Sequence, residues 1–256
     1  MAMDLGRYGS REVLKLQMFD ATTEKPLMYF DYANTVSQAW AATRVYANGA
    51  GARRMAWDGD KQETLTVETQ VFTMQHLALL AGEEIKSGAA NIYRSEILTV
   101  IDGGSGAKTV QLSKPAIGGA EAVSVFAYVN GVLAEPQDIE TVTGSDVELA
   151  TSATVAIGDE VEVYYQFQSA ASHTLQFTAK GFPKYVKLVG DTLYQDEVSG
   201  EAVAAQITYY KAKLQPNFTL AMSSSGDPAS VSLVFDLFAH KLDGVDVTSE
   251  LVLYEE

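Results

Sequence analysis

The sequence predicts a mainly β protein: a β-sandwich or barrel with one short helix, which carries an inserted second β-sandwich. Three observations lead to this prediction. Apolar and polar side chains alternate over many short segments, as they do in strands with one buried face. β-branched and aromatic residues are frequent in those segments, as pleated surfaces favour. The chain has 256 residues, which is enough to bury a sizeable core in one large domain or two small ones.

The alternating segments define the expected strands. Within each segment the apolar residues are two positions apart, so they share one face of a strand. These residues are Leu14, Leu16 and Met18; Leu65 and Val67; Val161, Val163, Tyr165 and Phe167; Phe218, Leu220 and Met222; and Val231, Leu233 and Phe235.

One segment breaks the alternation and predicts the helix. The residues that carry its pattern are Phe72, Met74–His76, Leu77, Leu79 and Leu80. Gly82 follows them, and glycine is the residue that most often ends a helix. We expect the apolar side of this short helix to cover one face of a sheet.

The composition changes near residue 96. From there to about residue 170 the chain is rich in small and β-branched residues, and turn signals divide it into short segments. The signals are Asp102-Gly103-Gly104, Gly118-Gly119, Asn130-Gly131, Gly144-Ser145-Asp146 and Gly158-Asp159. Such spacing is typical of a small sandwich, and Asn-Gly between apolar residues predicts a hairpin. We therefore expect residues 1–95 and 172–256 to form one discontinuous domain. Residues 96–171 form the insert, and residues 169–172 are its return linker.

The charge and the cysteine count exclude several classes of function. The net charge is −15, from 33 acidic and 18 basic residues. A protein that binds nucleic acid tightly needs the opposite sign. The acidity serves solubility, or it forms a surface past which a polyanion slides without sticking. There is no cysteine, which excludes disulfides and thiolate metal sites. No apolar run resembles a signal peptide or a membrane helix, so we expect no membrane partner.

We expect no catalytic, cofactor-binding or metal-binding residues, and therefore a protein that is not an enzyme. Residues 103–109 lack the glycine spacing and the following helix of a phosphate loop. His76, His173 and His240 are far apart and lie in no metal-binding spacing. There is no Gly-x-Ser-x-Gly nucleophile elbow.

Two stretches resemble bacteriophage tail tube proteins. Residues 57–82, WDGDKQETLTVETQVFTMQHLALLAG, are similar to the strand-then-helix segment of that family. Residues 211–239 begin KAKLQPNFTL and continue SGDPA and VFDLFA. They resemble the closing strand pair of tube subunits from contractile-tailed phages. Together the stretches lie within the discontinuous domain and cover up to half of the chain.

The resemblance implies a tail-tube-like β-sandwich or barrel, and it implies that the insert is immunoglobulin-like. It further implies a homo-oligomer of six-fold rings stacked into a hollow tube, through which DNA passes without specific binding. The implied partners are other tail proteins such as sheath, baseplate and terminator. The implied location is the virion tail, assembled in the host cytoplasm.

The segment from Asn48 to Asp60 is the expected contact between subunits. We interpret it as a long, glycine-rich loop, with Asp58-Gly59-Asp60 as a turn. Its charged and polar side chains would give stacked rings an adaptable contact. The residues assigned to the contact are Asn48, Arg53, Arg54, Asp58 and Asp60.

Two alternatives remain open from the residues. The chain could be a capsid decoration or baseplate-type virion protein, which would form monomers or trimers rather than rings. It could also be a carbohydrate-binding or hydrolytic β-sandwich protein. That class needs exposed aromatic rings on one sheet face, or two carboxylates at the separation found in glycosidases.

Overall fold

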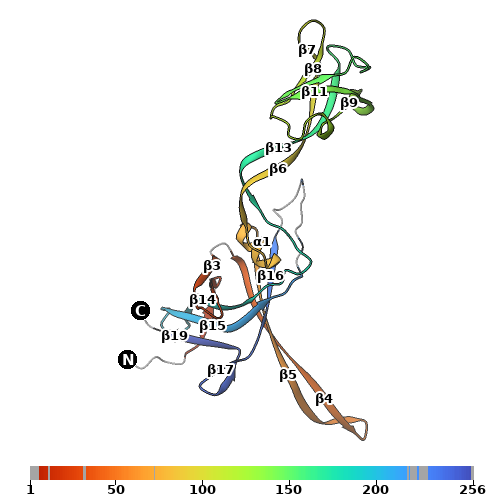
Figure 1. Ribbon diagram of the computed structural model, residues 1–256. Coiled ribbons are helices and arrows are strands. Elements are labelled where there is room, and N and C mark those ends of the chain that lie inside the picture. The colour runs from red at the N-terminus through yellow and green to blue at the C-terminus, as the bar shows by residue number, and fades with distance from the viewer. Residues whose placement is uncertain are drawn as a thin grey trace. The chain divides into compact units, whose positions relative to one another are not determined.

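The computed structural model describes residues 6–10, 12–30, 33–71, 73–217, 219, 224 and 230–254. The chain divides into two compact units. Unit 1 comprises Met1–Ile85 and Leu175–Glu256, and unit 2 comprises Lys86–Thr174. Both are built from antiparallel strands (Figure 1), and one short α-helix lies in unit 1. The predicted mainly β fold with one short helix is therefore confirmed.

Unit 1 is organised around a nine-stranded antiparallel sheet with the main order β3-β2-β14-β15-β16-β5-β4. β1 adds to β14 and β19 adds to β15, while β17 and β18 form a separate hairpin. The strands are β1 (Tyr8–Ser10), β2 (Lys15–Asp20), β3 (Pro26–Phe30), β4 (Ala33–Gly49), β5 (Ala52–Thr69), β14 (Tyr185–Asp196), β15 (Ala202–Leu214), β16 (Val231–Leu237), β17 (His240–Leu242), β18 (Val245–Val247) and β19 (Ser249–Tyr254).

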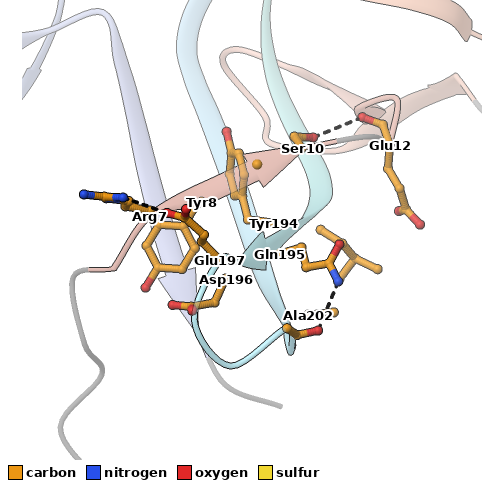
Figure 2. A pocket seen from close by; sticks show the side chains of 12 residues that line it. Arg7, Tyr8, Ser10, Glu12, Tyr194, Gln195, Asp196, Glu197 and Ala202 are labelled. Atoms are coloured by element: carbon orange, nitrogen blue, oxygen red, sulfur yellow. Dashed lines mark hydrogen bonds and ion pairs between the residues drawn. The ribbon is translucent and has the colours of Figure 1, made fainter.

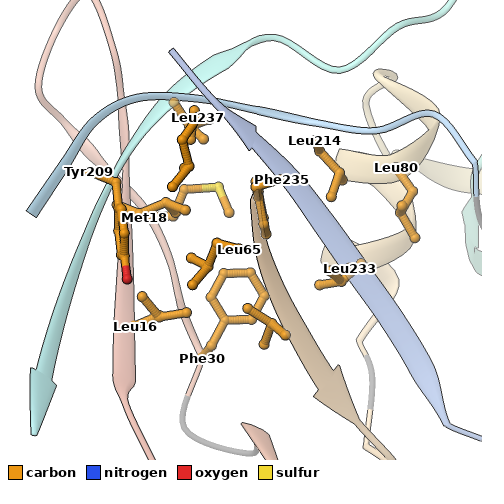
Figure 3. Close-up of a cluster of buried hydrophobic side chains, with 14 of the residues drawn as sticks. Leu16, Met18, Phe30, Leu65, Leu80, Tyr209, Leu214, Leu233, Phe235 and Leu237 are labelled. Atoms are coloured by element: carbon orange, nitrogen blue, oxygen red, sulfur yellow. The ribbon is translucent and has the colours of Figure 1, made fainter. Parts of the chain in front are cut away.

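One hydrophobic core fills unit 1 (Figure 3), and it draws on both ends of the sheet. Leu16 and Met18 of β2 pack in the same cluster as Leu65 of β5 and Phe235 of β16. Each of these side chains is almost completely buried, which stabilises the fold by about 1.5–3 kcal/mol per side chain. The predicted strand faces are confirmed here. The strand expected at Phe218, Leu220 and Met222 lies outside the described residues.

The predicted helix is α1 (Met74–Ala81). It begins with a capping box in which the Thr73 hydroxyl accepts from the backbone N–H of His76, and the His76 ring accepts from the N–H of Thr73. Such reciprocal bonds satisfy amides that have no partner inside the helix. Gly82 ends the helix at φ 65°, a left-handed conformation that glycine adopts at low cost. The predicted helix and its final glycine are confirmed. Phe72 lies outside the described residues.

Unit 2 consists of two four-stranded sheets, β10-β9-β13-β6 and β11-β12-β8-β7. Their inward faces share a second hydrophobic core. The elements are β6 (Lys86–Thr99), β7 (Ile101–Asp102), β8 (Lys108–Gln111), the short 3-10 helix η1 (Ala120–Ala122), β9 (Ser124–Val129), β10 (Val132–Gln137), β11 (Ile139–Thr143), β12 (Asp146–Leu149) and β13 (Glu160–Thr174). Asn130 and Gly131 join β9 to β10 with φ values of 52° and 80°, so the predicted Asn-Gly hairpin is confirmed.

The return segment at residues 169–172 is not a linker. It belongs to β13, which pairs with β6 from Glu160↔Thr99 to Thr174↔Lys86. The only irregularity in that pairing is a register shift between Ser169 and Ser172. A run of small residues can form a strand when a long neighbouring strand supplies the backbone hydrogen bonds. The composition of residues 169–172 alone does not reveal that neighbour. The immunoglobulin-like character of residues 96–171 stays a prediction.

Candidate subunit contact surface

The β4–β5 hairpin extends away from the rest of unit 1 as a two-stranded ribbon (Figure 1). β5 pairs with β16 from Glu63 to Thr69. Before Glu63, β4 is the only strand that pairs with β5 among the described residues. This part of the ribbon is roughly 35 Å long at about 3.4 Å per residue. A lone two-stranded ribbon is marginally stable in water, so a surface that covers it would stabilise it.

The prediction of a loop at residues 48–60 is wrong. β4 continues to Gly49 and β5 starts at Ala52, so the turn is only Ala50–Gly51. Both turn residues have positive φ, 51° and 76°, which matches the twist of paired strands. Because the turn is so short, the residues on both sides of it are paired in strands. The glycines at 49 and 51 are typical of a loop, and they obscured the alternation of apolar and polar residues beside them.

Asp58-Gly59-Asp60 is likewise not a turn, because all three residues lie within β5. The pairing shifts register here, between Ala42↔Lys61 and Arg44↔Asp58, so β5 holds one residue more than β4. This is a β-bulge, which increases local twist. A side chain at Gly59 would collide with the Thr43 hydroxyl, and that close approach explains the glycine.

The five residues assigned to the contact do lie on this ribbon. Asn48 pairs with Arg53, and Arg54 donates from Nε to the Gly49 carbonyl at 3.2 Å. Asp58 forms an ion pair with Arg44, and Asp60 is exposed in β5. Their role as a contact between subunits stays a proposal.

One face of the ribbon is polar. Side chains alternate across a strand, so Arg44 and Tyr46 share a face. The Arg53 guanidinium lies 4.0 Å from the centre of the Tyr46 ring, and the ion pair of Arg44 with Asp58 lies beside it. The hydrogen bond and charge of Asp58 raise the pKa of Arg44, and the bond from Arg44 lowers the pKa of Asp58. This face therefore stays charged at neutral pH.

The opposite face of the ribbon is apolar, and sequence reasoning missed it. Val45 pairs with Trp57 and Ala47 pairs with Met55. Val45 is 66% exposed, Met55 59% and Trp57 53%. Contiguous apolar surface of this kind marks an interaction site. Val45 and Ala47 are two positions apart in the sequence, and so are Met55 and Trp57. This spacing of apolar residues was the signal that could have revealed the apolar face.

A buried polar network fixes the base of the hairpin. The Glu63 carboxylate accepts hydrogen bonds from the Gln38 amide and from the Ser249 hydroxyl, the latter at 2.8 Å. The Tyr209 hydroxyl donates to the Gln38 carbonyl oxygen at 3.0 Å. Burial, followed by the charge of Glu63, raises the pKa of Tyr209. The network joins β4 and β5 to β15 and β19, so it sets the direction in which the ribbon leaves the sheet.

A second surface feature lies beside β1 (Figure 2). It is a hollow of about 990 Å³ between β1, the end of β14 and the turn after it. Arg7 and Glu197 form an ion pair across it at 3.2 Å, with both side chains exposed. Exposed pairs contribute little to stability. Tyr8 lies against Tyr194 at a ring separation of 6.4 Å. No acid–base or nucleophilic pair comes together in this hollow among the residues that line it.

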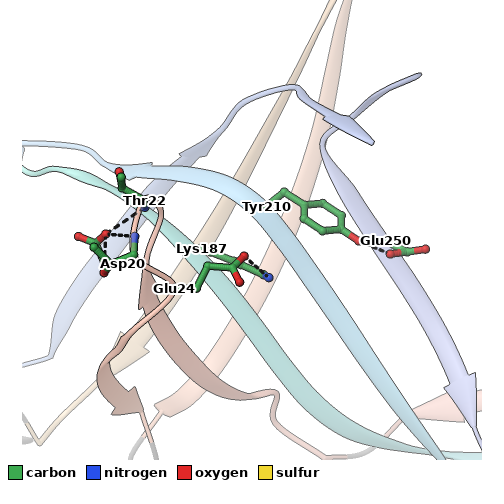
Figure 4. A network of polar contacts seen from close by, with 7 residues as sticks. Asp20, Thr22, Glu24, Lys187, Tyr210 and Glu250 are labelled. Carbon is green, nitrogen blue, oxygen red and sulfur yellow. Dashed lines mark hydrogen bonds and ion pairs between the residues drawn. The ribbon is translucent and has the colours of Figure 1, made fainter. Parts of the chain in front are cut away.

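Polar contacts hold the β2–β3 turn and β19 in place (Figure 4). The Asp20 carboxylate accepts from the backbone N–H of Thr23 at 2.7 Å and of Thr22 at 2.9 Å. These bonds, that of Thr23 most strongly, lower the pKa of Asp20. Asp20 is therefore a fixed negative charge at neutral pH.

The Tyr210 hydroxyl donates to Glu250, which raises the pKa of Tyr210 to about 12.

The histidines lie in separate environments. His76 caps α1 and stacks on Phe30, the Nδ1 of His173 is 2.9 Å from the Ser87 hydroxyl, and His240 stacks on Tyr210. Within the described ranges, no three metal-ligating side chains gather at one point. Among the same residues no helix is long and apolar enough to cross a membrane.

Unit 2 carries exposed aromatic rings on one sheet face. Val125 and Val163 point into the core, so Phe126 and Tyr164 lie on the outer face by alternation. Tyr93 on β6, 82% exposed, is on the same face because it pairs with Gln166. Phe126 and Tyr164 meet edge to face at 87°. They therefore do not form one flat platform.

Comparison with known proteins gives one family. Residues 10–249 match the YomU/Tube protein family, which covers both units almost completely. The comparison with curated proteins gives no match.

Proposed function

We propose that this chain, which belongs to the YomU/Tube protein family, is the subunit of a bacteriophage tail tube, in which six-fold rings stack around a channel for DNA. The observation that carries the proposal is the match to a tube family over residues 10–249. This match supports a structural role in a tube. The proposed location is the tail of a virion, and the proposed partners include sheath, baseplate and terminator proteins.

The hairpin supports assembly from copies of one chain. Its apolar face and its charged face are both open to solvent in the single subunit. The outer edge of β4 has no strand partner among the described residues, and open edges favour pairing with another chain. Assembly in a closed ring removes such edges. We therefore assign Asn48, Arg53, Arg54, Asp58 and Asp60 to the contact between subunits.

The net charge of −15 supports a channel that conducts DNA without holding it. Binding to a phosphate backbone requires basic side chains that displace counterions. A surface with excess carboxylates repels the backbone and lets it slide. The proposal thus predicts no stable complex between the assembled protein and duplex DNA at physiological salt.

Unit 2 is proposed to project outward from the tube, because a unit pointing inward would block the channel. Its separate core supports independent folding. Lys86 and Thr174, the first and last residues of the unit, are paired across β6 and β13. The chain therefore leaves and re-enters unit 1 at neighbouring points, as inserted domains do.

Negative-stain microscopy of the purified protein tests the proposal. Tubes or six-fold rings are the expected result. Isolated monomers or trimers over the whole accessible concentration range would contradict it and would favour a capsid decoration or baseplate-type protein.

A second candidate is carbohydrate binding by unit 2, favoured by the exposed ring of Tyr93 on the same sheet face as Phe126 and Tyr164. Aromatic faces next to polar groups can stack on sugar rings, and Glu162 lies on the same face by alternation. Calorimetric titration with soluble bacterial polysaccharides tests it. Heat of binding that disappears in Tyr93→Ala would support this candidate, and its absence would exclude it.

A further inference from the structure

A pocket of about 360 Å³ opens in unit 1 between α1, the β2–β3 hairpin and the start of β14. Apolar residues make up half of its lining: Met18, Leu27, Met28, Ala78, Leu79, Ile85 and Val186. Leu27 is 51% exposed, so part of this apolar lining is open to solvent. Pockets of this size accept a bulky apolar group.

The pocket also carries a net negative charge. Asp20, Glu83 and Glu84 line it together with one ammonium group, that of Lys184. Three carboxylates against one cation leave two net negative charges. Asp20 is held in its charged form by the Thr22 and Thr23 amides. A partner that enters this pocket should therefore carry an apolar group beside positive charge.

The tip of the β4–β5 hairpin has that chemistry. Met55 and Trp57 expose apolar side chains on one face of the ribbon. Arg53, which lies over Tyr46 on the opposite face, and Arg54 bring two positive charges to the same tip. The ion pair of Arg44 with Asp58 is internal to the ribbon, so it leaves the charge of the two arginines uncompensated. The hairpin tip, with its apolar side chains and two arginines, therefore complements an apolar pocket that has two excess carboxylates.

The pocket and the hairpin tip of one copy lie at opposite ends of unit 1. The tip, at Ala50–Gly51, precedes β5, and α1 follows the far end of β5. An 18-residue strand spans up to roughly 60 Å. Figure 1 shows the ribbon pointing away from α1. A hairpin therefore reaches the pocket of a second copy rather than its own, and such a head-to-tail contact repeats without limit along an axis.

We propose that the hairpin tip of one subunit inserts into this pocket of the next, with Trp57 and Met55 against its apolar lining and Arg53 and Arg54 against Asp20, Glu83 and Glu84. The inference rests on the proposed tube and names the surface that receives the hairpin. The contact joins successive rings along the tube axis.

Cross-linking between cysteines tests the contact directly, because the chain has no cysteine of its own. Met55→Cys is combined with Gln75→Cys, an exposed position that lines the pocket. Assembled protein treated with a short bismaleimide should give a ladder of covalent multimers. The matched pair Met55→Cys with Val132→Cys, the latter exposed in unit 2, and each single variant should give none.

The outcomes separate the two levels of the proposal. Tubes that form normally but give no ladder, or a ladder equal to that of the controls, overturn the pocket contact and leave the tube intact. Particles that never assemble overturn both. Should the cysteine pair fail to fold, as judged by its circular dichroism, the charge exchange described next decides the question.

Charge reversal gives an independent test. Arg53→Glu with Arg54→Glu leaves four net negative charges at the contact, so we expect tubes to be lost at concentrations where the unaltered protein assembles. Adding Glu84→Lys should restore tubes, at least in part. Glu84 is chosen because Glu83 also binds the Thr178 hydroxyl. The control Glu160→Lys, in unit 2, changes the net charge equally and should not restore them. Equal rescue by both lysines, or by neither, would overturn the contact.

Discussion

Replacing Trp57 by serine should weaken assembly without weakening the fold of the single subunit. Trp57 is 53% exposed on the apolar face of the hairpin. A tryptophan side chain exposes about 150–250 Å² when free, so roughly 100 Å² remains for a partner to cover. At about 25 cal/mol per Å², covering it contributes about 2.5 kcal/mol per contact. Since about 1.4 kcal/mol is a factor of ten in an equilibrium constant, the loss is on the order of 50-fold to 100-fold in association.

The assay is the critical concentration for tube formation, followed by light scattering. We expect Trp57→Ser to raise it by more than tenfold, while the thermal midpoint of the unassembled subunit changes little, because surface substitutions usually cost less than about 0.5 kcal/mol. Tyr93→Ser, which removes a still more exposed ring from unit 2, is the matched control. An unchanged critical concentration for Trp57→Ser, or an equal rise in both variants, would refute the assignment of this face to the contact.

Three further outcomes follow from the fold. Gly82→Ala should lower the free energy of unfolding by about 1–2 kcal/mol, because alanine resists the left-handed conformation and its Cβ would enter neighbouring backbone; Gly9→Ala, which meets open space, should not. The hydrogen bond to Glu250 raises the pKa of Tyr210, so its stabilisation is complete below pH 10 and is lost as pH rises through about 12. Absorbance titration should show one phenol ionising near pH 12 that is missing in Tyr210→Phe. Replacing Lys86–Thr174 with a short Gly/Ser linker should leave unit 1 folded and able to form rings, because the two ends are paired; folded protein without rings in microscopy would show that unit 2 belongs to the contact.

The core of unit 1 could be predicted because each of its strands buries one face, and that face carries every second residue of the strand. Leu16, Met18 and Leu233 alternate with polar residues, and each is completely buried or nearly so. Gly82 and the Asn130-Gly131 turn were equally predictable, because each position requires positive φ, which few residues adopt readily.

The protruding part of the hairpin, before Glu63 in β5, could not be predicted from the same rule, because neither of its faces is buried within one subunit. Trp57 and Val45 belong to runs in which apolar and polar residues alternate as regularly as they do in the core strands. In a single subunit, however, this alternation does not correspond to a buried face. Glycines at 51 and 59 indicated a loop, whereas the first belongs to a two-residue turn and the second to a bulge. The residues assigned to the contact were found through their charge, and the apolar half of the surface was missed.

The pocket that receives the hairpin also lay beyond sequence reasoning. Met18, Gln75 and Lys184 come from three distant parts of the chain. The pairing of β2 with β14 and the packing of α1 on the core of unit 1 bring their elements together. Glu83 and Glu84, an adjacent acidic pair in the sequence, also line that pocket.

Electron cryo-microscopy of the assembled protein tests the central claim most directly. We predict stacked rings with six-fold symmetry in end-on views and an open central channel. In side views, density for residues 45–57 should lie against α1 of the next ring. Particles without a channel, or rings in which the hairpin remains free in solvent, would contradict the account.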